Sequence, residues 1–167
     1  RDGTLACASC HLQERAFSDG RVTSPGVTGE LTPRNTMALA NVGYAPVLTW
    51  ANPLLKTLEQ QALVPMVGQE PVELGLAGMD AKVAERLHSQ GVYRRLFAQA
   101  FPEVRGEVSL ATITRALAAF QRTLISVRAP SDRKRYEGEL DAAHDRERRT
   151  ALRGGNEVIL GNAQCFV

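Results

Sequence analysis

Five consecutive residues near the start of the sequence, Cys7-Ala8-Ser9-Cys10-His11, have the types and spacing that attach a c-type haem. Two thiols three positions apart can add to the two vinyl groups of one porphyrin, and the adjacent histidine can then face the iron as its proximal ligand. A zinc or redox Cys-x-x-Cys that happens to precede a histidine is the competing interpretation. A zinc site needs further Cys or His ligands at suitable spacing, and His88 and His144 stand alone in separate segments. The pattern therefore predicts one covalently attached haem.

Loops and short helices surround this motif. Residues 12–35 combine glycines and prolines with polar residues, which predicts a long loop, and loops of that length are uncommon unless they wrap a ligand. The clearest helix spans residues 109–127, where apolar side chains recur at steps of three and four. Further helices are predicted over residues 36–45, 56–65, 80–90 (capped by Asp80) and 93–101, with a loop over residues 66–79. No strand signal or repeat is visible, so the expected fold is all-α, a cytochrome c-like haem domain with long loops.

Composition bounds the class of protein. The 167 residues hold 44% hydrophobic side chains, enough for a core, and 20 basic and 18 acidic residues leave a net charge of +2, which indicates no nucleic-acid partner. No apolar run is long enough to span a membrane. The chain begins at Arg1 without an initiator Met or a signal peptide, so we expect a trimmed product. Because haem c is attached outside the bacterial cytoplasm, the expected compartment is the periplasm.

An ordered series of short stretches follows the haem motif. They are Phe17-Ser18-Asp19-Gly20, Arg34-Asn35, Trp50, Leu58-Glu59-Gln60-Gln61-Ala62-Leu63-Val64-Pro65, Pro71-Val72-Glu73-Leu74, Tyr93-Arg94-Arg95-Leu96-Phe97 and Ala118-Ala119-Phe120-Gln121-Arg122-Thr123-Leu124. In type and order the series resembles the bacterial di-haem cytochrome c peroxidases and their MauG-like relatives over nearly the whole chain. Trp50-Ala51-Asn52-Pro53 departs from the peroxidases' usual Trp-Asp-Gly-Arg and is more similar to the MauG-related branch, whose members oxidise residues of a partner protein.

The resemblance implies a site for hydrogen peroxide. Glu73 corresponds to the family's proton-transferring carboxylate, Gln61 to the glutamine that helps to hold the peroxide, and Pro65 to a residue that limits the space above the iron. Taken alone, the same residues have ordinary explanations. Glu73 can be a solvated loop carboxylate like Glu70, Gln61 a polar surface position, and Pro65 the end of a helix.

The resemblance places two further residues between a pair of haems. Trp50 would relay an electron, although a single tryptophan is more often part of a core. Asn35 corresponds to an asparagine that ligates calcium, and an amide oxygen suits that ion, but other ligands would come from outside this chain. No histidine occurs in residues 12–49, so we expect an iron that stays open on its distal side.

The end of the chain predicts a division into domains. Residues 1–130 form the expected N-terminal, peroxidatic haem domain. Residues 131–167 form a charged linker and the start of a second haem domain, cut at Cys165, which the resemblance places in a second attachment motif. A lone terminal cysteine needs no such truncation. The expected activity is reduction of hydrogen peroxide, with electrons from a second haem and from a small electron-donor protein or a protein substrate.

Two other functions stay open. A mono-haem electron carrier needs a second axial ligand, commonly Met, and Met66 and Met79 follow His11 at suitable distances. Such a carrier has no need of the Gln61 and Glu73 pattern. The other is a haem domain that is inactive without its electron partner.

Overall fold

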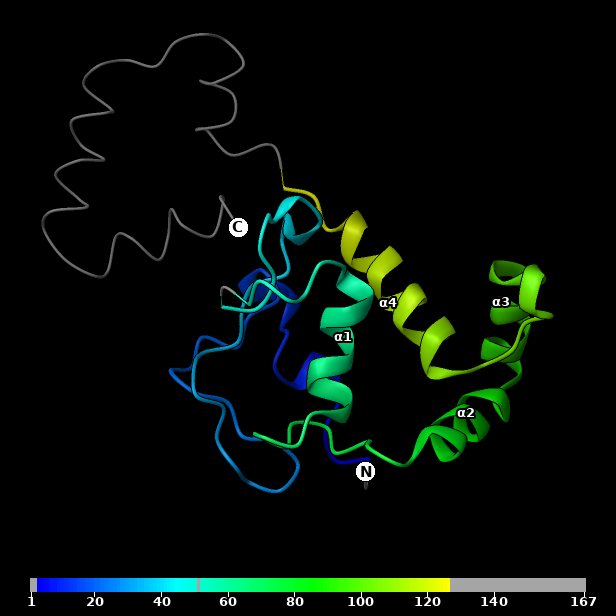
Figure 1. Ribbon diagram of the computed structural model, residues 1–167, viewed down its shortest axis with the longest axis horizontal. Helices are drawn as coiled ribbons and strands as arrows, with labels where there is room; N and C mark the ends of the chain where they lie inside the picture. Colours follow the sequence, from blue (N-terminus) through cyan, green and yellow to red (C-terminus); the bar gives the residue numbers. More distant parts are fainter. Residues whose placement is uncertain (1–2, 51, 127–167) are drawn as a thin grey trace, which may run out of the picture.

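The computed structural model describes residues 3–50 and 52–126, which form α-helices joined by long loops (Figure 1). The helices are α1 (Leu58–Val67), α2 (Asp80–His88), α3 (Gly91–Ala100) and α4 (Leu110–Thr123), and the short 3-10 turns are η1 (Cys7–Ser9), η2 (Gln13–Arg15), η3 (Val42–Tyr44) and η4 (Pro102–Val104). Within these residues there is no strand, only isolated bridges that join Leu12 to Ser18, Pro25 to Leu31 and Leu48 to Asn52. The prediction of an all-α fold with long loops is confirmed.

Helices α1 and α4 pack against each other at the centre of the molecule, and each begins with a capping box (Figure 1). Thr57 Oγ1 accepts from the Gln60 N–H at 3.2 Å, and Gln60 Oε1 accepts from the Thr57 N–H at 3.3 Å. Ser109 and Thr112 form the same reciprocal pair at the start of α4. These pairs satisfy N–H groups that the start of a helix leaves without partners, so they fix where both helices begin.

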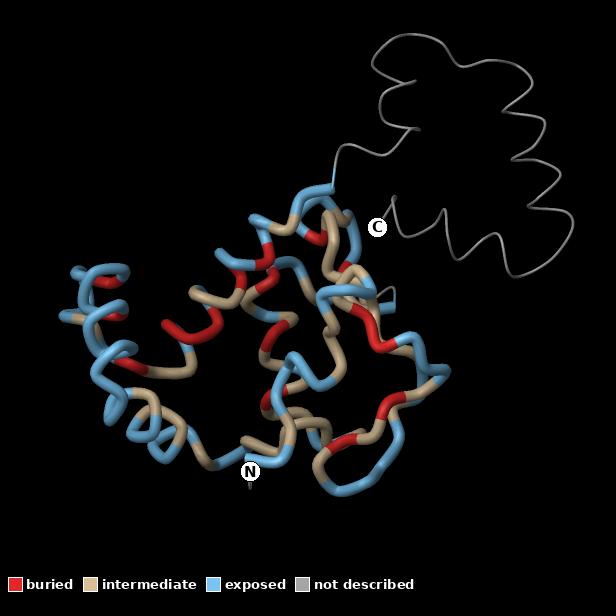
Figure 2. The backbone as a smooth tube through the Cα atoms, turned by 180° about the vertical axis from the view of Figure 1, so that it is seen from behind, coloured by how far each residue is buried: buried red, intermediate tan, exposed pale blue. Residues whose placement is uncertain are grey.

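Two hydrophobic clusters form the core, and α4 contributes to both. The buried members of the first are Met66, Phe97, Phe101, Val108 and Ile113; those of the second are Val42, Leu48, Leu58 and Ala118. Ala118 is completely buried. Helix α2 has no buried residue and α3 has only Phe97, and most residues of this pair have the colour of exposed residues in Figure 2.

The helix predicted over residues 36–45 is wrong, because only the turn η3 forms there. Asn41 has a left-handed φ of 62°, and its N–H donates to the Leu124 carbonyl at 2.7 Å. Its side chain pairs with the Ser126 backbone through bonds of 2.8 and 3.0 Å. This pairing between distant segments replaces local helical bonds. It also ends α4 at Thr123, short of the predicted end near residue 127.

The other predicted boundaries need smaller corrections. Helix α1 continues through Pro65 to Val67, so the proline lies in the last turn and does not end the helix. Asp80 is the first residue of α2 and Met79 is its N-cap, and the helix ends at His88. None of the helices within the described ranges is both long and apolar enough to cross a membrane. Cys165 and the predicted linker lie outside the described residues.

Candidate active site

The two thiols of the attachment motif lie on one short turn. The N–H groups of Cys10 and His11 both donate to the Cys7 carbonyl, at 3.2 and 2.9 Å. The Ser9 hydroxyl closes the turn by accepting from the Ala6 N–H at 3.1 Å. Both cysteines are free thiols, and they border two adjoining cavities, Cys7 the larger and Cys10 the smaller.

His11 is held in the tautomer that a metal ligand needs. Its Nδ1 donates to the Phe17 carbonyl at 2.7 Å. Because a carbonyl can only accept, Nδ1 carries the proton, and in the neutral ring Nε2 then has the lone pair. The carbonyl is aimed by a tight loop in which Ala16 and Phe17 have left-handed φ angles of 54° and 63°, and the Phe17 N–H closes the loop on the Leu12 carbonyl at 2.8 Å. Such outer partners orient ligating histidines in metalloproteins.

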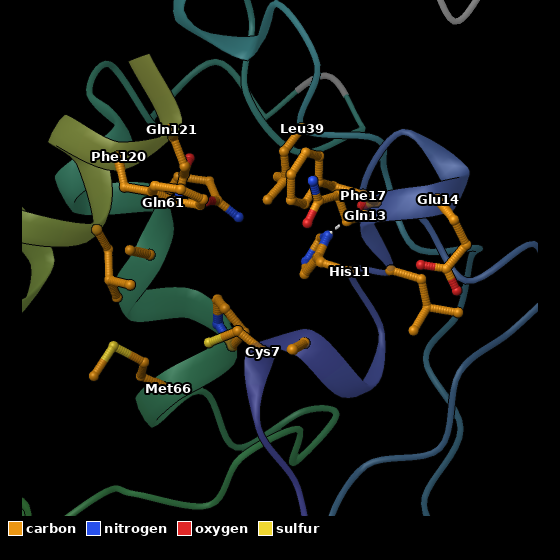
Figure 3. A pocket seen from close by; sticks show the side chains of 15 residues that line it. Cys7, His11, Gln13, Glu14, Phe17, Leu39, Gln61, Met66, Phe120 and Gln121 are labelled. Carbon is orange, nitrogen blue, oxygen red and sulfur yellow. Dashed lines mark hydrogen bonds between the residues drawn. The ribbon is translucent and has the colours of Figure 1, made fainter. Parts of the chain in front are cut away.

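Two adjoining cavities, of about 460 and 240 Å³ and here together called the crevice, are lined by residues of the N-terminal segment and of α1; Figure 3 shows the larger one. They share His11, Leu39, Gln61 and Pro65. Cavities of this size are typical of cofactor sites. Two thiols, one imidazole lone pair and largely apolar walls match the two vinyl groups, the iron and the ring of a haem. The residues present therefore fit a haem c.

Gln61 and Pro65 lie one turn apart on α1 and border both cavities. Residues four positions apart share one face of a helix, so this face of α1 looks into the crevice. Gln61 is half-buried, and in Figure 3 its amide reaches into the space that His11 also enters. The structure thus brings together the imidazole, the amide and the proline that the sequence singled out separately.

Glu73 is half-buried at the wall of the smaller cavity, on the loop between α1 and α2. Burial raises the pKa of its carboxyl above the ordinary value. Glu70 is exposed and borders neither cavity, as predicted for a solvated carboxylate. A carboxyl with a raised pKa holds its proton to a higher pH, which suits a group that must take up a proton and give it back.

Trp50 connects the smaller cavity to the surface. It borders the cavity, yet 48% of its surface is exposed, so it is not a core residue. Its Nε1 donates to the Asn35 carbonyl at 3.2 Å, and the Arg34 guanidinium lies 5.5 Å from the ring centroid. Within residues 3–50 and 52–126, no cluster of three or more His, Cys, Asp or Glu side chains could hold a metal ion. The amide of Asn35 therefore has no acidic cluster around it in this part of the chain.

A buried carboxylate near Cys10 had no predicted role. Asp19 is 6% exposed; it accepts from Ser24 Oγ at 2.6 Å and from the Arg21 N–H at 3.0 Å. Burial acts to raise its pKa, but these hydrogen bonds outweigh burial and place the pKa below the ordinary value. Ser24 Oγ also bonds Thr36 Oγ1 at 2.8 Å, and Thr36 borders the smaller cavity beside Cys10. The stretch Phe17–Gly20 was the only sign of this network in the sequence.

Helix α4 adds a second unexpected group. Gln121 borders the larger cavity and is 8% exposed, and its Oε1 has no hydrogen-bond partner among the described residues. The neighbouring Phe120 packs edge-on against Phe17, with ring centroids 6.3 Å apart. A buried polar atom without a partner is costly, so this oxygen destabilises the fold unless a further group or a water reaches it. In the sequence, Gln121 was noted only as part of the stretch of residues 118–124 that resembles the family.

The positions of the two candidate methionines, Met66 and Met79, do not favour an electron carrier. Met66 borders the larger cavity, but its side chain points away from His11 in Figure 3 and packs in the first core cluster. Met79 borders neither cavity, and His88 is exposed on α2 and borders neither.

Comparison with known proteins agrees with this geometry. A family model described as di-haem cytochrome c peroxidase matches residues 1–141. The chain belongs to this family. Membership brings haem c as the class of cofactor and makes the mono-haem carrier the less favoured function.

Individual relatives show the same kinship. The methylamine utilization protein MauG of Methylophilus methylotrophus is 37% identical over 133 residues, which cover 80% of this chain and 38% of that protein. The cytochrome c peroxidase Ccp of Escherichia coli (strain K12) is 32% identical over 133 residues, covering 79% and 27%. A crystal structure of a MauG-like protein associated with microbial copper homeostasis matches with a TM-score of 0.78 and 45% identity, over 92% of this chain and 44% of that one. The chain thus has the MauG-like fold and spans less than half the length of these relatives.

Proposed function

We propose that the full protein reduces hydrogen peroxide at a haem bound in this crevice, and that Glu73 carries the proton. The observation that supports it is the position of a carboxyl with a raised pKa and of the Gln61 amide at the wall of the cavity that His11 enters. The net reaction consumes one hydrogen peroxide, two electrons and two protons and yields two waters. The O–O bond breaks, and both oxygens are reduced.

The haem, when bound, supplies the open iron position for peroxide and the route by which electrons reach it. Cys7 and Cys10 would anchor the ring through thioether bonds, and His11 Nε2 would ligate the iron. Residues 12–49 contain no histidine that could occupy that position.

The side chains around the smaller cavity would then handle the proton. The ionised Glu73 carboxylate accepts a proton from one peroxide oxygen and returns it to the other, which leaves as water. Gln61 orients the peroxide by hydrogen bonding, and Pro65 limits the volume available to it.

The electrons would reach this site from a second haem, whose attachment motif would include Cys165, and from a protein partner. Trp50 is suited to relay them because it spans from the cavity to the surface. The 45% identity to a MauG-like protein favours the MauG-like branch, and because that relative is associated with copper homeostasis, a copper-handling protein is the first partner to test. We place the protein in the periplasm, where haem c is attached. Asn35 would supply one ligand to a calcium ion between the haems.

Substitution of Glu73 by Gln tests the proposal in the full-length, haem-loaded protein. The amide keeps the size of the side chain but cannot transfer the proton, so the reaction with hydrogen peroxide, followed by rapid-mixing absorbance, should slow by about a hundred- to ten-thousand-fold. Haem content and the ferric spectrum should not change. Glu70→Gln is the matched control, because Glu70 is exposed on the same loop, and it should react at the parental rate. A parental rate for Glu73→Gln would make Glu73 an ordinary loop carboxylate.

A further inference from the structure

Glu73 lies on an irregular segment between α1 and α2, so its position depends on what holds that backbone. From α1, the Pro65 carbonyl accepts from the Leu74 N–H at 2.9 Å. From a segment far away in the sequence, the Val27 N–H donates to the carbonyl of Glu73 itself at 2.7 Å. The backbone at Glu73 is therefore hydrogen-bonded both to α1 and to this distant segment.

That distant segment is residues 24–31, here called the brace loop. Its Glu30 carboxylate accepts from the Val72 N–H at 3.1 Å, so the brace loop bonds to two consecutive residues of the Glu73 segment. Gly26 packs against the same two residues. A Cβ at position 26 would overlap the Val72 carbonyl oxygen and lie 3.1 Å from Glu73 Cα, so only glycine permits this approach.

Hydrogen bonds fix the conformation of the brace loop and join it to the rest of the domain. Its Gly26 N–H donates to the Glu30 carbonyl at 2.7 Å, and the Ser24 carbonyl accepts from the Thr32 N–H at 2.9 Å. Ser24 is buried and donates to the buried Asp19 at 2.6 Å. The loop thus connects the buried carboxylate network near Cys10 to the segment that carries Glu73.

We infer that the brace loop positions the Glu73 carboxyl at the smaller cavity, with Glu30 and Gly26 as positioning residues. The inference rests on the proposed role of Glu73 as proton carrier. Glu30 is exposed and borders neither cavity, so it acts through the Val72 N–H and touches neither haem nor peroxide. A surface carboxylate would in this way control the geometry of proton transfer.

The test uses the full-length, haem-loaded protein with Glu30→Ala, Glu30→Gln and Gly26→Ala, beside Glu73→Gln. In Glu30→Ala the amide hydrogen of Val72 should exchange faster in mass-spectrometric hydrogen exchange. The reaction with hydrogen peroxide should slow by up to about a hundredfold, because a shift of about 1 Å can cost that much.

Glu30→Gln keeps an oxygen that can accept the Val72 N–H, so it should have most of the parental rate. Gly26→Ala should slow the reaction as well. Glu70→Ala removes a nearby exposed carboxylate with no such bond and should leave rate and exchange unchanged.

The outcomes separate the two ideas. Unchanged exchange at Val72 in Glu30→Ala would overturn the brace. Faster exchange with a parental peroxide rate, while Glu73→Gln is slow, would show that the bond is structural only and would overturn the inference but leave the proposed function standing. A parental rate in Glu73→Gln would overturn both.

Discussion

Two carboxylates near Cys10 have opposite tendencies to hold a proton, and their hydrogen-bond donors account for the difference. Burial raises the pKa of Glu73. For Asp19, donors from Ser24 and Arg21 outweigh burial and lower the pKa. Carboxyl groups whose pKa values are pushed apart can take different roles in one site. The arrangement suits Glu73 to exchange a proton and Asp19 to stay a fixed negative charge beside the haem attachment point.

The raised pKa of Glu73 predicts a pH dependence. Glu73 must be ionised to accept a proton from peroxide, so the rate of the peroxide reaction should fall as the pH drops through its pKa. Because that pKa is raised, the midpoint of the fall should lie above the value of about 4.3 for an unperturbed glutamate. Rapid-mixing rates measured across the acid range would show this fall. The fall should be absent in Glu73→Gln and present in Glu70→Gln. If it persisted in Glu73→Gln, another group would be responsible for it.

Single residues differed in how far the sequence could predict them. The five-residue motif alone predicts Cys7, Cys10 and His11 as the haem ligands, because its spacing matches one porphyrin, and these roles stay predictions. Gln61 and Glu73 needed the family resemblance, and their roles stay predictions. The bond from His11 to a carbonyl and the burial of Asp19 depend on how the loop closes, which no local pattern in the sequence encodes.

At the scale of elements, the contact between α1 and α4 positions the crevice wall. Ala118 is completely buried and clusters with Leu58 of α1, while Ala119 is exposed on the same helix. Ala118→Leu should lower the free energy of unfolding by about 1–3 kcal/mol, because the extra volume has no space. It should also slow the peroxide reaction, because α1 carries Gln61.

Ala119→Leu is the matched control and should stay within about 0.5 kcal/mol of the parent in denaturant unfolding. If both substitutions changed the free energy of unfolding equally, the buried contact of Ala118 would not be what packs α4 against α1.

The elements also show where local patterns are sufficient. Helices α1 and α4 were predicted close to their true starts, and both begin after a local capping residue, Thr57 or Ser109; only α4 also has an apolar stripe. The helix over residues 36–45 was wrong because Asn41 pairs with Leu124 and the Ser126 backbone. A contact between segments so far apart in the sequence leaves no trace in either one alone.

At the scale of the whole molecule, the crevice is large for a small domain. The walls of the larger cavity, about 460 Å³, are largely apolar, and this surface is removed from water only when a ring fills the cavity. The whole stability of a typical domain is only about 5–15 kcal/mol. We therefore expect a ring in the crevice to contribute a large share of the stability of this fold.

A chain that cannot form thioether bonds provides the test. The double substitution Cys7→Ser and Cys10→Ser, produced without haem, should lose the cooperative unfolding transition of the haem-loaded parent and much of its helical circular dichroism. A sharp transition with parental helix content in this variant would show that the protein closes the crevice by itself.

The size of the crevice also has a consequence for the order of biogenesis. If the fold needs the ring, the attachment machinery meets a chain whose Cys7–Ser9 turn is not yet fixed, and both thiols are accessible to it. Thioether formation would then come first and the packing of α1 against α4 second. Haem delivery, rather than release from the ribosome or arrival in the compartment, would be the event that starts folding.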